Sequence, residues 1–371
     1  MAVCTTIGDL GEFGVIARVT ARFPGSDDVI LGPGDDAALI AAPDRRVVAT
    51  TDVLVEGRHF RRDWSAPCDI GHKAVAQNIA DLAAMGARPT GLLIGLAAPA
   101  DLPTAWADAF AEGVGAECAA AGCTVAGGDT VRSDLLTIAV TALGDLGGRS
   151  AVRRDGARPG DTVAVCGPLG LSAAGYALLT AGIAPGHDPG AAGSPAPRDA
   201  AAEPDWALCL REHRRPGPPY AEGPRAARLG ATAMLDVSDG LVQDLGHIAR
   251  GSGVAIDVET ALLHPHPALS AAVSALDAAG RAPRGSVDLM LAGGEDHALA
   301  ATFPPGTALP AAWVRIGSVR EGSGVTVDGR PSQESGWDHF GGADGKHSGG
   351  ADSKHSGGAD GKHSGGVGGA H

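Results

Sequence analysis

The 371-residue sequence contains only four lysines, and three of them lie within its last thirty residues. Lys73 stands alone in the rest of the chain, inside Ile70-Gly71-His72-Lys73-Ala74, which does not match the Gly-x-x-x-x-Gly-Lys-Ser/Thr phosphate loop. The Val-Ala-Ile-Lys strand of protein kinases is also missing. A chain that handles nucleotide phosphates without these lysines must use metal ions and arginine.

Other absences narrow the class of protein. Aromatic residues make up only 4% of the chain, so the cores must be built from Ala, Val, Leu and Ile. No run of eighteen apolar residues occurs, which excludes a membrane-spanning helix, and residues 1–9 do not have the pattern of a secretory signal. The six cysteines form no Cys-x-x-Cys pair, so we expect reduced thiols in a cytoplasmic protein.

The charge is strongly negative. The chain carries 43 acidic and 29 basic side chains, for a formal net charge of −14. Sequence-independent binding of nucleic acids depends on a basic surface, so we expect neither a nucleic acid nor a membrane as a partner.

The pattern of apolar runs and turns predicts two mixed α/β domains and a tail. A turn-rich break at Gly147–Asp161 separates an N-terminal domain (1–150) from a C-terminal α/β domain (151–340). Pro185–Asp205 is rich in Pro, Gly and Ala and is expected to be a flexible loop. Residues 341–371 are a Gly/His-rich repeat with almost no apolar content, so we expect a disordered tail. Its histidines could chelate a transition metal, but a passive tail is favoured.

Within the two domains, short apolar runs and longer amphipathic stretches alternate. The predicted strands are Val47–Thr51, Leu135–Ala142, Thr162–Cys166, Ala233–Val237 and Gly253–Val258. The predicted helices are Cys68–Met85, Ala105–Ala121, Leu171–Ala181, Gly240–Arg250 and Pro267–Ala279.

Acidic residues recur beside glycine or at the ends of apolar runs. A carboxylate in such a place is costly unless a cation neutralises it, and magnesium, which prefers oxygen ligands and retains water, suits this role. For a single Asp-Gly pair a simple turn is the better interpretation, whereas the whole set favours metal binding. Asp81 is the sharpest case, because four-residue spacing on a helix places Lys73, Gln77 and Asp81 on one face.

Seven acidic or glycine-rich motifs, in this order, resemble those of the thiamine-monophosphate kinase family. They are Gly34-Asp35-Asp36-Ala37-Ala38, Thr50-Thr51-Asp52-x-x-Val55-Glu56-Gly57-x-His59-Phe60, Asn78-x-x-Asp81-Leu82-Ala83-Ala84-Met85-Gly86-Ala87, Gly127-Gly128-Asp129-Thr130, Arg154-x-Gly156-Ala157-x-Pro159-Gly160-Asp161, Asp236-x-Ser238-Asp239-Gly240-Leu241 and Gly293-Gly294-Glu295-Asp296. The likeness runs from about Gly8 to Phe340 and includes the closing Gly336-Trp337-x-x-Phe340.

The resemblance implies a fold, a reaction and a set of site residues. The fold is the two-domain fold of aminoimidazole ribonucleotide synthetase, whose N-terminal domain binds ATP and metal and dimerises through its sheet. The reaction converts ATP and thiamine phosphate to ADP and thiamine diphosphate with several magnesium ions, so ATP, thiamine phosphate and a second copy of the chain are the implied partners. By resemblance the metal ligands are Asp36, Thr50, Thr51, Asp52, Asp81, Asp129, Asp236 and Asp239; the ATP contacts are Gly128, Asp129, Arg154 and Ser238; and the thiamine phosphate contacts are His59, Glu295 and Trp337.

The residues suit this chemistry independently of the resemblance. Because the acceptor is already a phosphate anion, the reaction needs no strong general base, and metals with positioning groups can bring the two polyanions together. The sequence departs from the family at two places, and neither is a proposed metal ligand. His297 follows Gly293-Gly294-Glu295-Asp296, where the family usually has an aromatic residue, and Phe110-Ala111 stand where the family can offer a tyrosine to adenine.

Other functions remain open at this level. The same fold serves aminoimidazole ribonucleotide synthetase, selenophosphate synthetase and a hydrogenase-maturation enzyme. A selenophosphate synthetase would need a catalytic cysteine beside a lysine, and Cys4 has no lysine next to it. An inactive nucleotide-binding regulator is the alternative from another class, against which the nearly complete set of acidic residues argues.

Overall fold

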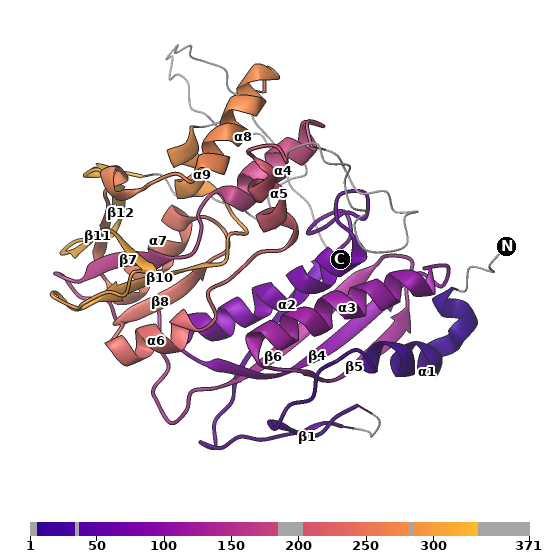
Figure 1. Ribbon diagram of the computed structural model, residues 1–371. Helices are drawn as coiled ribbons and strands as arrows, with labels where there is room; N and C mark the ends of the chain where they lie inside the picture. Colours follow the sequence, from indigo (N-terminus) through magenta and orange to yellow (C-terminus); the bar gives the residue numbers. More distant parts are fainter. Residues whose placement is uncertain (1–5, 34–36, 185–202, 282–284, 333–371) are drawn as a thin grey trace, which may run out of the picture. The chain divides into compact units, whose positions relative to one another are not determined.

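The computed structural model describes residues 6–33, 37–184, 203–281 and 285–332 (Figure 1). The expectations for Cys4, Asp36, Trp337, the repeat tail and most of the 185–205 loop lie outside these ranges. The described residues belong to one structural unit, and the expected domain boundary near residue 150 stays a proposal.

The first half of the chain builds a four-stranded sheet. Its strands lie in the order β3 (Val48–Val55), β6 (Thr137–Asp145), β4 (Arg88–Ala98) and β5 (Val125–Arg132). Only β4 and β5 are parallel, and α3 (Thr104–Ala121) makes the crossover that a parallel pair requires. The helices α2 (Pro67–Ala84) and α3 lie together on one face of this sheet (Figure 1).

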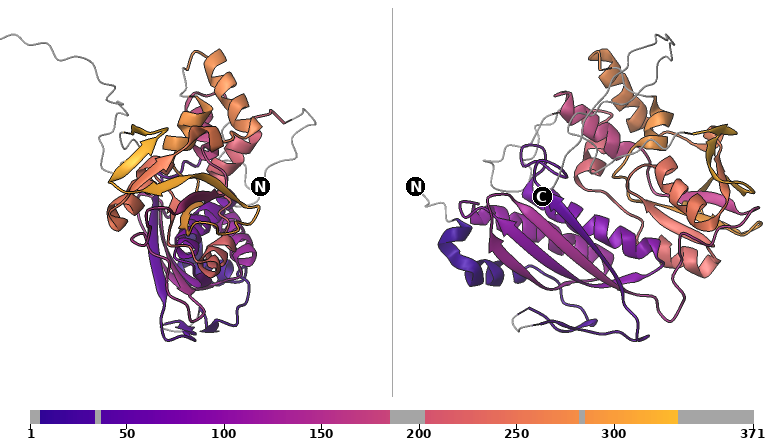
Figure 2. Two further views of the ribbon diagram at one scale, coloured as in Figure 1. Left: turned by 90° about the vertical axis from the view of Figure 1, so that its left-hand side faces the viewer. Right: turned by 180° about the vertical axis from the view of Figure 1, so that it is seen from behind.

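Alternation along the strands gives this sheet two different faces. Leu54, Ile94 and Val140 are buried in the core that includes α2 and α3. On the other face, Val53 and Leu93 remain exposed, and within the described ranges no helix lies over them (Figure 2). The remaining elements of this half are α1 (Ile7–Thr20), β1 (Val29–Leu31) and β2 (Leu39–Ile40), the last two forming a ribbon that reaches Gly91 at one end of the open face.

The second half builds a seven-stranded sheet, again counted over the described residues. Its order is β13 (Arg330–Pro331), β12 (Gly324–Val327), β9 (Ala255–Val258), β11 (Trp313–Arg320), β7 (Thr162–Cys166), β10 (Ala298–Phe303) and β8 (Ala233–Val237). All neighbours are antiparallel except β12 and β9. The accompanying helices are α4 (Leu171–Thr180), α5 (Ala207–Arg214), α6 (Glu222–Leu229), α7 (Leu241–Ser252), the 3₁₀ turn Thr260–Leu262, α8 (Pro267–Ala278) and α9 (Ser286–Ala292).

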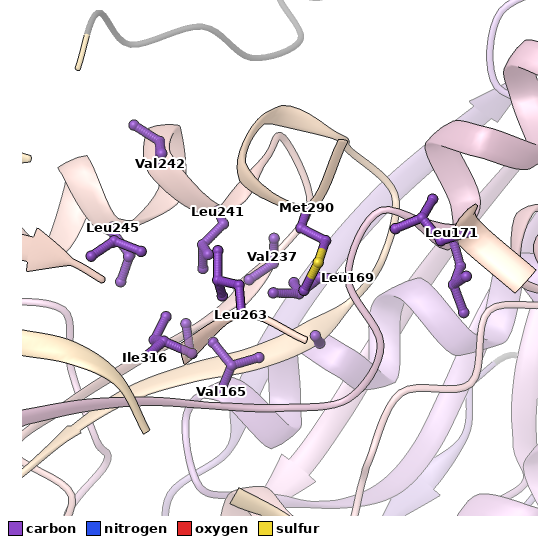
Figure 3. Close-up of a cluster of buried hydrophobic side chains, with 14 of the residues drawn as sticks. Val165, Leu169, Leu171, Val237, Leu241, Val242, Leu245, Leu263, Met290 and Ile316 are labelled. Atoms are coloured by element: carbon purple, nitrogen blue, oxygen red, sulfur yellow. The ribbon is translucent and has the colours of Figure 1, made fainter. Parts of the chain in front are cut away.

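The larger core lies between one face of this sheet and the helices α4, α7, α8 and α9. In Figure 3, Val165 of β7 and Val237 of β8 gather with Leu241 of α7 and Met290 of α9. Apart from Met290 these are aliphatic side chains, as the shortage of aromatic residues requires.

The other face of the seven-stranded sheet packs against α2. Met234 of β8 and Leu299 of β10 form one buried cluster with Ala83 and Ala84 at the end of that helix. A Cβ atom on Gly223 of α6 would come within 2.0 Å of the Ala83 carbonyl oxygen, so only glycine allows this close approach. The helix α2 therefore lies between the two sheets and contacts both.

All ten predicted elements are present, and Thr162–Cys166 and Ala233–Val237 have the predicted bounds. Prediction missed the other twelve described α-helices and strands. Among them, β4 and β5 were missed because Gly91, Gly95, Gly127 and Gly128 interrupt their apolar patterns. Two expectations about strand ends are wrong. Asp52, expected directly after a strand, lies inside β3, because the backbone stays paired with β6 as far as Val55.

The same correction applies to Asp129, which follows an apolar run but lies inside β5 rather than at its end. Its backbone continues in register with β4 to Arg132.

Among the described helices, none combines the length and the hydropathy that a membrane span requires.

Candidate active site

Three side chains of α2 reach toward other elements from one face of the helix, as the four-residue spacing predicted. Lys73 Nζ donates to Glu295 Oε2 at 3.1 Å, Gln77 hydrogen-bonds the Asp52 carboxylate, and Asp81 meets Thr50. The face therefore spans from the loop before β10 to the strand β3.

Thr50 and Asp52 project from β3 toward α2, because residues two apart on a strand share a face. Thr50 Oγ1 donates to Asp81 Oδ2 at 2.6 Å. The Asp52 amide donates to Asn78 Oδ1 at 3.1 Å, and Asn78 is in turn held by the Ala74 carbonyl at 2.9 Å. These bonds tie the middle of β3 to the middle of α2.

Asp236 reaches the same region from the other sheet. On β8 it shares with Met234 the face that packs against α2. Its Oδ2 lies 3.2 Å from Nδ1 of His297, both side chains being buried. His297 has a φ of 51°, a strained backbone for a residue other than glycine, and its amide donates to the Val237 carbonyl at 2.8 Å.

Two of these carboxyl groups, Asp52 and Asp81, are costly to ionise. Burial first, then the charges of Asp236 and Asp52, raise the pKa of Asp81 to about 7 against a hydrogen bond from Thr50 that lowers it. The pKa of Asp52 is raised mainly by burial and also by Asp236, while Gln77, His297 and His59 act in the opposite direction. Negative charge thus converges here from two sheets and the helix between them.

Two histidines lie close to these carboxylates and offset part of their negative charge. Burial disfavours the charged form of His297, but the hydrogen bond and the charge of Asp236 outweigh it and raise the pKa of this imidazole. His59 lies within electrostatic reach of Asp52, and its Nδ1 accepts a hydrogen bond from the Val55 amide at 3.0 Å.

A cleft of about 550 Å³ opens beside this group. Thr50, Asp81 and Asp236 line it together with Arg154, which follows the first sheet in the chain. A second hollow of about 460 Å³ shares Arg153 and Asp155 with it. The cleft therefore combines an exposed arginine with carboxylates of the kind that bind metal ions. Arginine and metal ions are what a lysine-poor chain needs to handle phosphates.

The loop before α7 is held by a carboxylate that the sequence did not single out. Asp244 Oδ2 accepts hydrogen bonds from the amides of Ser238, Asp239 and Gly240 at 3.0–3.1 Å. Burial raises the pKa of Asp244 to about 7 against these bonds, with Asp236 and Asp239 adding to the rise. The Ser238 carbonyl accepts from the Glu295 amide at 2.7 Å, so the two loops that carry predicted ligands are bonded to each other.

Three predicted residues lie apart from this group of carboxylates. Thr51 faces the open side of the first sheet, where its hydroxyl donates to the Val140 carbonyl at 3.0 Å. Asp129 lies on that side too, three strands from β3, or roughly 14 Å at the usual strand spacing. Gly128 shares a face with Asp52, and a Cβ atom there would meet the Ile94 carbonyl oxygen at 2.0 Å. Their ligand roles stay predictions.

Prediction also missed positioning groups. Asn78 appears inside a motif but was given no role, Asp244 lies just beyond the Asp236–Leu241 motif and was not singled out, and His297 was noted only as a departure. The first-turn position of Asp244, after Asp239-Gly240, was an available signal for a group that holds a helix N-terminus. Nothing local in the sequence could connect His297 with Asp236.

Within the described ranges, no three or more His, Cys, Asp or Glu side chains are grouped closely enough to hold a metal ion. Asp36, the first predicted ligand, lies outside those ranges.

Comparison with known proteins gives one consistent result. The family model for the "AIR synthase related protein, N-terminal domain" matches residues 34–146. A thiamine-monophosphate kinase of Mycobacterium tuberculosis is 46% identical over 342 residues, 91% of this chain and 94% of that protein. The solved thiamine-monophosphate kinase of Stenotrophomonas maltophilia is 36% identical with a TM-score of 0.71, covering 86% of this chain and 96% of the other. The structure of AaThiL complexed with AMPPCP and TMP is 34% identical with a TM-score of 0.68, covering 90% and 98%.

Proposed function

The chain belongs to the thiamine-monophosphate kinase family, and we propose that the cleft beside α2 is the place where it carries out the family's reaction. ATP-dependent phosphorylation of thiamine phosphate to thiamine diphosphate is the activity of this chain, as its relatives across bacteria and the AaThiL complex with the ATP analogue AMPPCP and with TMP indicate. The expectations of fold and enzyme class are thereby confirmed.

The proposed location of the reaction rests on one observation. Asp81 lies on the helix that contacts both sheets, and its pKa is raised to about 7 by burial and by two further carboxylates, one from each sheet. A protein does not gain stability from such crowding, whereas a site that must bind cations and the phosphates they accompany does require it.

We propose that several magnesium ions bind here during the reaction. Carboxylate and hydroxyl oxygens are the donors that magnesium prefers, and the raised pKa values of Asp52 and Asp81 are what a set of ligands short of a cation would have. The proposed ligands are Asp36, Thr50, Asp52, Asp81, Asp236 and Asp239. Thr51 and Asp129, whose side chains face the open side of the first sheet, are proposed as ligands outside the cleft. When bound, the ions would neutralise phosphate charge and align donor with acceptor.

The chain's own residues bind and orient the two substrates in this proposal. Arg154 at the cleft offers a permanent planar cation to ATP phosphate oxygens, with Gly128, Asp129 and Ser238 as further ATP contacts. His59, Glu295 and Trp337 hold thiamine phosphate. A phosphate oxygen of the acceptor attacks the γ-phosphorus, the bond from this phosphorus to the β,γ-bridging oxygen breaks, and ADP leaves.

The test is a direct assay. Purified protein with ATP, Mg²⁺ and thiamine phosphate should form ADP and thiamine diphosphate in equal amounts, and EDTA should stop the reaction. Unphosphorylated thiamine serves as the matched acceptor control. ATP hydrolysis without any thiamine diphosphate would contradict the proposed function.

We also propose a homodimer formed through the open face of the first sheet. Val53, Leu93 and Val131 are 47%, 37% and 51% exposed on that face, which is unusual for apolar residues grouped on one sheet. Sedimentation should give twice the chain mass, and Leu93→Asp should shift it toward the monomer. A monomeric wild type would contradict this proposal.

A cytoplasmic location is proposed as well. The five cysteines that the structure describes are all free, which suits a reducing compartment.

A further inference from the structure

Lys73 is buried beneath the loop that precedes β10. Its side chain is only 5% exposed, and a buried ammonium is costly unless it is paired. Its Nζ lies 3.1 Å from Glu295 Oε2 and 3.4 Å from the His213 carbonyl oxygen. Lys73 belongs to α2 in the first half of the chain, whereas both partners belong to the second half, so the amine joins the two halves.

His213 does not supply the positive charge of this cluster. Its Nδ1 lies 3.4 Å from Glu295 Oε2 and 3.2 Å from Ser172 Oγ. Burial, with the charge of Lys73 second, lowers the pKa of His213 to about 3, so the imidazole is neutral at physiological pH. The ammonium of Lys73 is therefore the cation that faces Glu295.

Glu295 is held at both its backbone and its side chain, yet part of it stays open. Its φ of 61° lies in the left-handed region, and its amide donates to the Ser238 carbonyl at 2.7 Å. The side chain is 38% exposed although Oε2 faces the amine. Burial opposes ionisation, but the charge and the hydrogen bond of Lys73 outweigh it and lower the pKa of this carboxyl.

A strained, ionised and partly open carboxylate is suited to meeting a cation or a donor group. Both thiamine phosphate and ATP carry an amino group, but only thiamine phosphate also carries a positively charged ring. The negative charge of Glu295 thus favours the acceptor over the nucleotide.

We propose that Lys73 is a positioning residue for the acceptor, which fixes the Glu295 carboxylate toward the cationic or amino group of thiamine phosphate. The inference rests on the proposed function and deepens it, because it assigns Lys73 a role that is exerted through Glu295. It makes acceptor binding dependent on how α2 and the loop before β10 are aligned.

The experiment is a double-mutant cycle with Lys73→Met, Glu295→Gln and the double variant, each assayed by varying thiamine phosphate and ATP in turn. Lys73→Met should raise the KM for thiamine phosphate about tenfold and leave the KM for ATP within about twofold. The double variant should be no worse than Glu295→Gln alone, because Lys73 has nothing left to position.

Asp69→Asn is the matched control. Asp69 also lies on α2 and is paired with Arg215 of the second half, outside the Glu295 cluster. It should lower the melting temperature without changing the ratio of the two KM values. If Lys73→Met does not fold, Lys73→Gln replaces it with the same expectation.

The outcomes separate the inference from the function. A wild type that makes thiamine diphosphate, combined with a Lys73 variant whose KM for thiamine phosphate is unchanged, overturns the inference alone. Equal rises in both KM values, or additive effects in the double variant, assign Lys73 a purely structural role and overturn it too. A wild type that makes no thiamine diphosphate overturns the proposed function and the inference with it.

Discussion

The helix α2 carries two charged clusters that are opposite in balance. Toward its C-terminal end, Asp81 lies within electrostatic reach of Asp52 and Asp236, and burial, followed by these like charges, raises the pKa values of Asp81 and Asp52. Toward its N-terminal end, Lys73 meets Glu295, and the opposite charge lowers the pKa of the carboxyl. Both clusters join α2 to the second half of the chain, so their location does not explain the difference.

The difference indicates two tasks. A repulsive cluster is incomplete until a cation arrives, which is suitable where metal-bound phosphates must bind and leave. A balanced cluster is complete by itself, which is suitable for holding a recognition group in one geometry. The reaction is accordingly expected at the Asp81 end and acceptor recognition at the Lys73 end.

The largest effect is expected from Asp52→Asn. Loss of a ligand from the repulsive cluster should raise the barrier by several kcal/mol and lower kcat roughly a thousandfold, while the protein stays folded. Steady-state assays with circular dichroism as the folding control will measure it. Near-normal activity in the folded variant at ordinary Mg²⁺ would contradict a role of Asp52 as a metal ligand.

A smaller and selective effect is expected from Arg154→Ala. Its guanidinium lines the cleft and offers permanent charge to ATP phosphates, so the KM for ATP should rise about tenfold with little change for thiamine phosphate. This is the reverse of the split expected for Lys73→Met. Arg153→Ala, which removes an arginine paired with Asp155, is the neighbouring control. The same split in both variants would show that the charge of the loop, and not Arg154 itself, matters.

The pH dependence of stability should reveal the repulsive cluster in the metal-free protein. Asp81 has a folded pKa of about 7 against an ordinary value of 3.8, so the folded state holds the proton more tightly than the unfolded chain. This contribution to stability is present below about pH 4 and is lost as the pH rises to about 7. Asp81→Asn should flatten the fall in melting temperature over this window, and Mg²⁺ should stabilise the wild type most at its upper end. If the melting temperature of Asp81→Asn fell with pH as steeply as that of the wild type, the raised pKa of Asp81 would be contradicted.

The smallest effect is expected from deleting residues 341–371. The repeat has almost no apolar side chains to bury and belongs to neither cluster, so kinetics and melting temperature should stay unchanged. A fall of several degrees on truncation would show that the tail contributes to the fold.

Local pattern was sufficient for ten of the twenty-two described α-helices and strands, and for the face of α2. The spacing of Lys73, Gln77 and Asp81 follows from helical geometry alone, and all three reach outward as predicted. Strand ends were less accessible, because the length of β3 depends on pairing with β6, a strand more than eighty residues away. The strands β4 and β5 were missed for the same reason, since partners and not propensity stabilise their glycines.

By itself, the sequence determined that the chain has no lysine phosphate loop, which family it belongs to, and that its phosphate chemistry depends on acidic residues and arginine. These follow from composition and from the order of the motifs, which are properties of the chain. Tertiary structure alone decided which charges meet. It brought Asp236 and His297 beside Asp81, paired Lys73 with Glu295 across more than two hundred residues, and turned Thr51 and Asp129 to the open face of the sheet. The physical reason is that a pKa and an ion pair depend on distance and burial, which alternation along a strand and the packing of α2 between two sheets create.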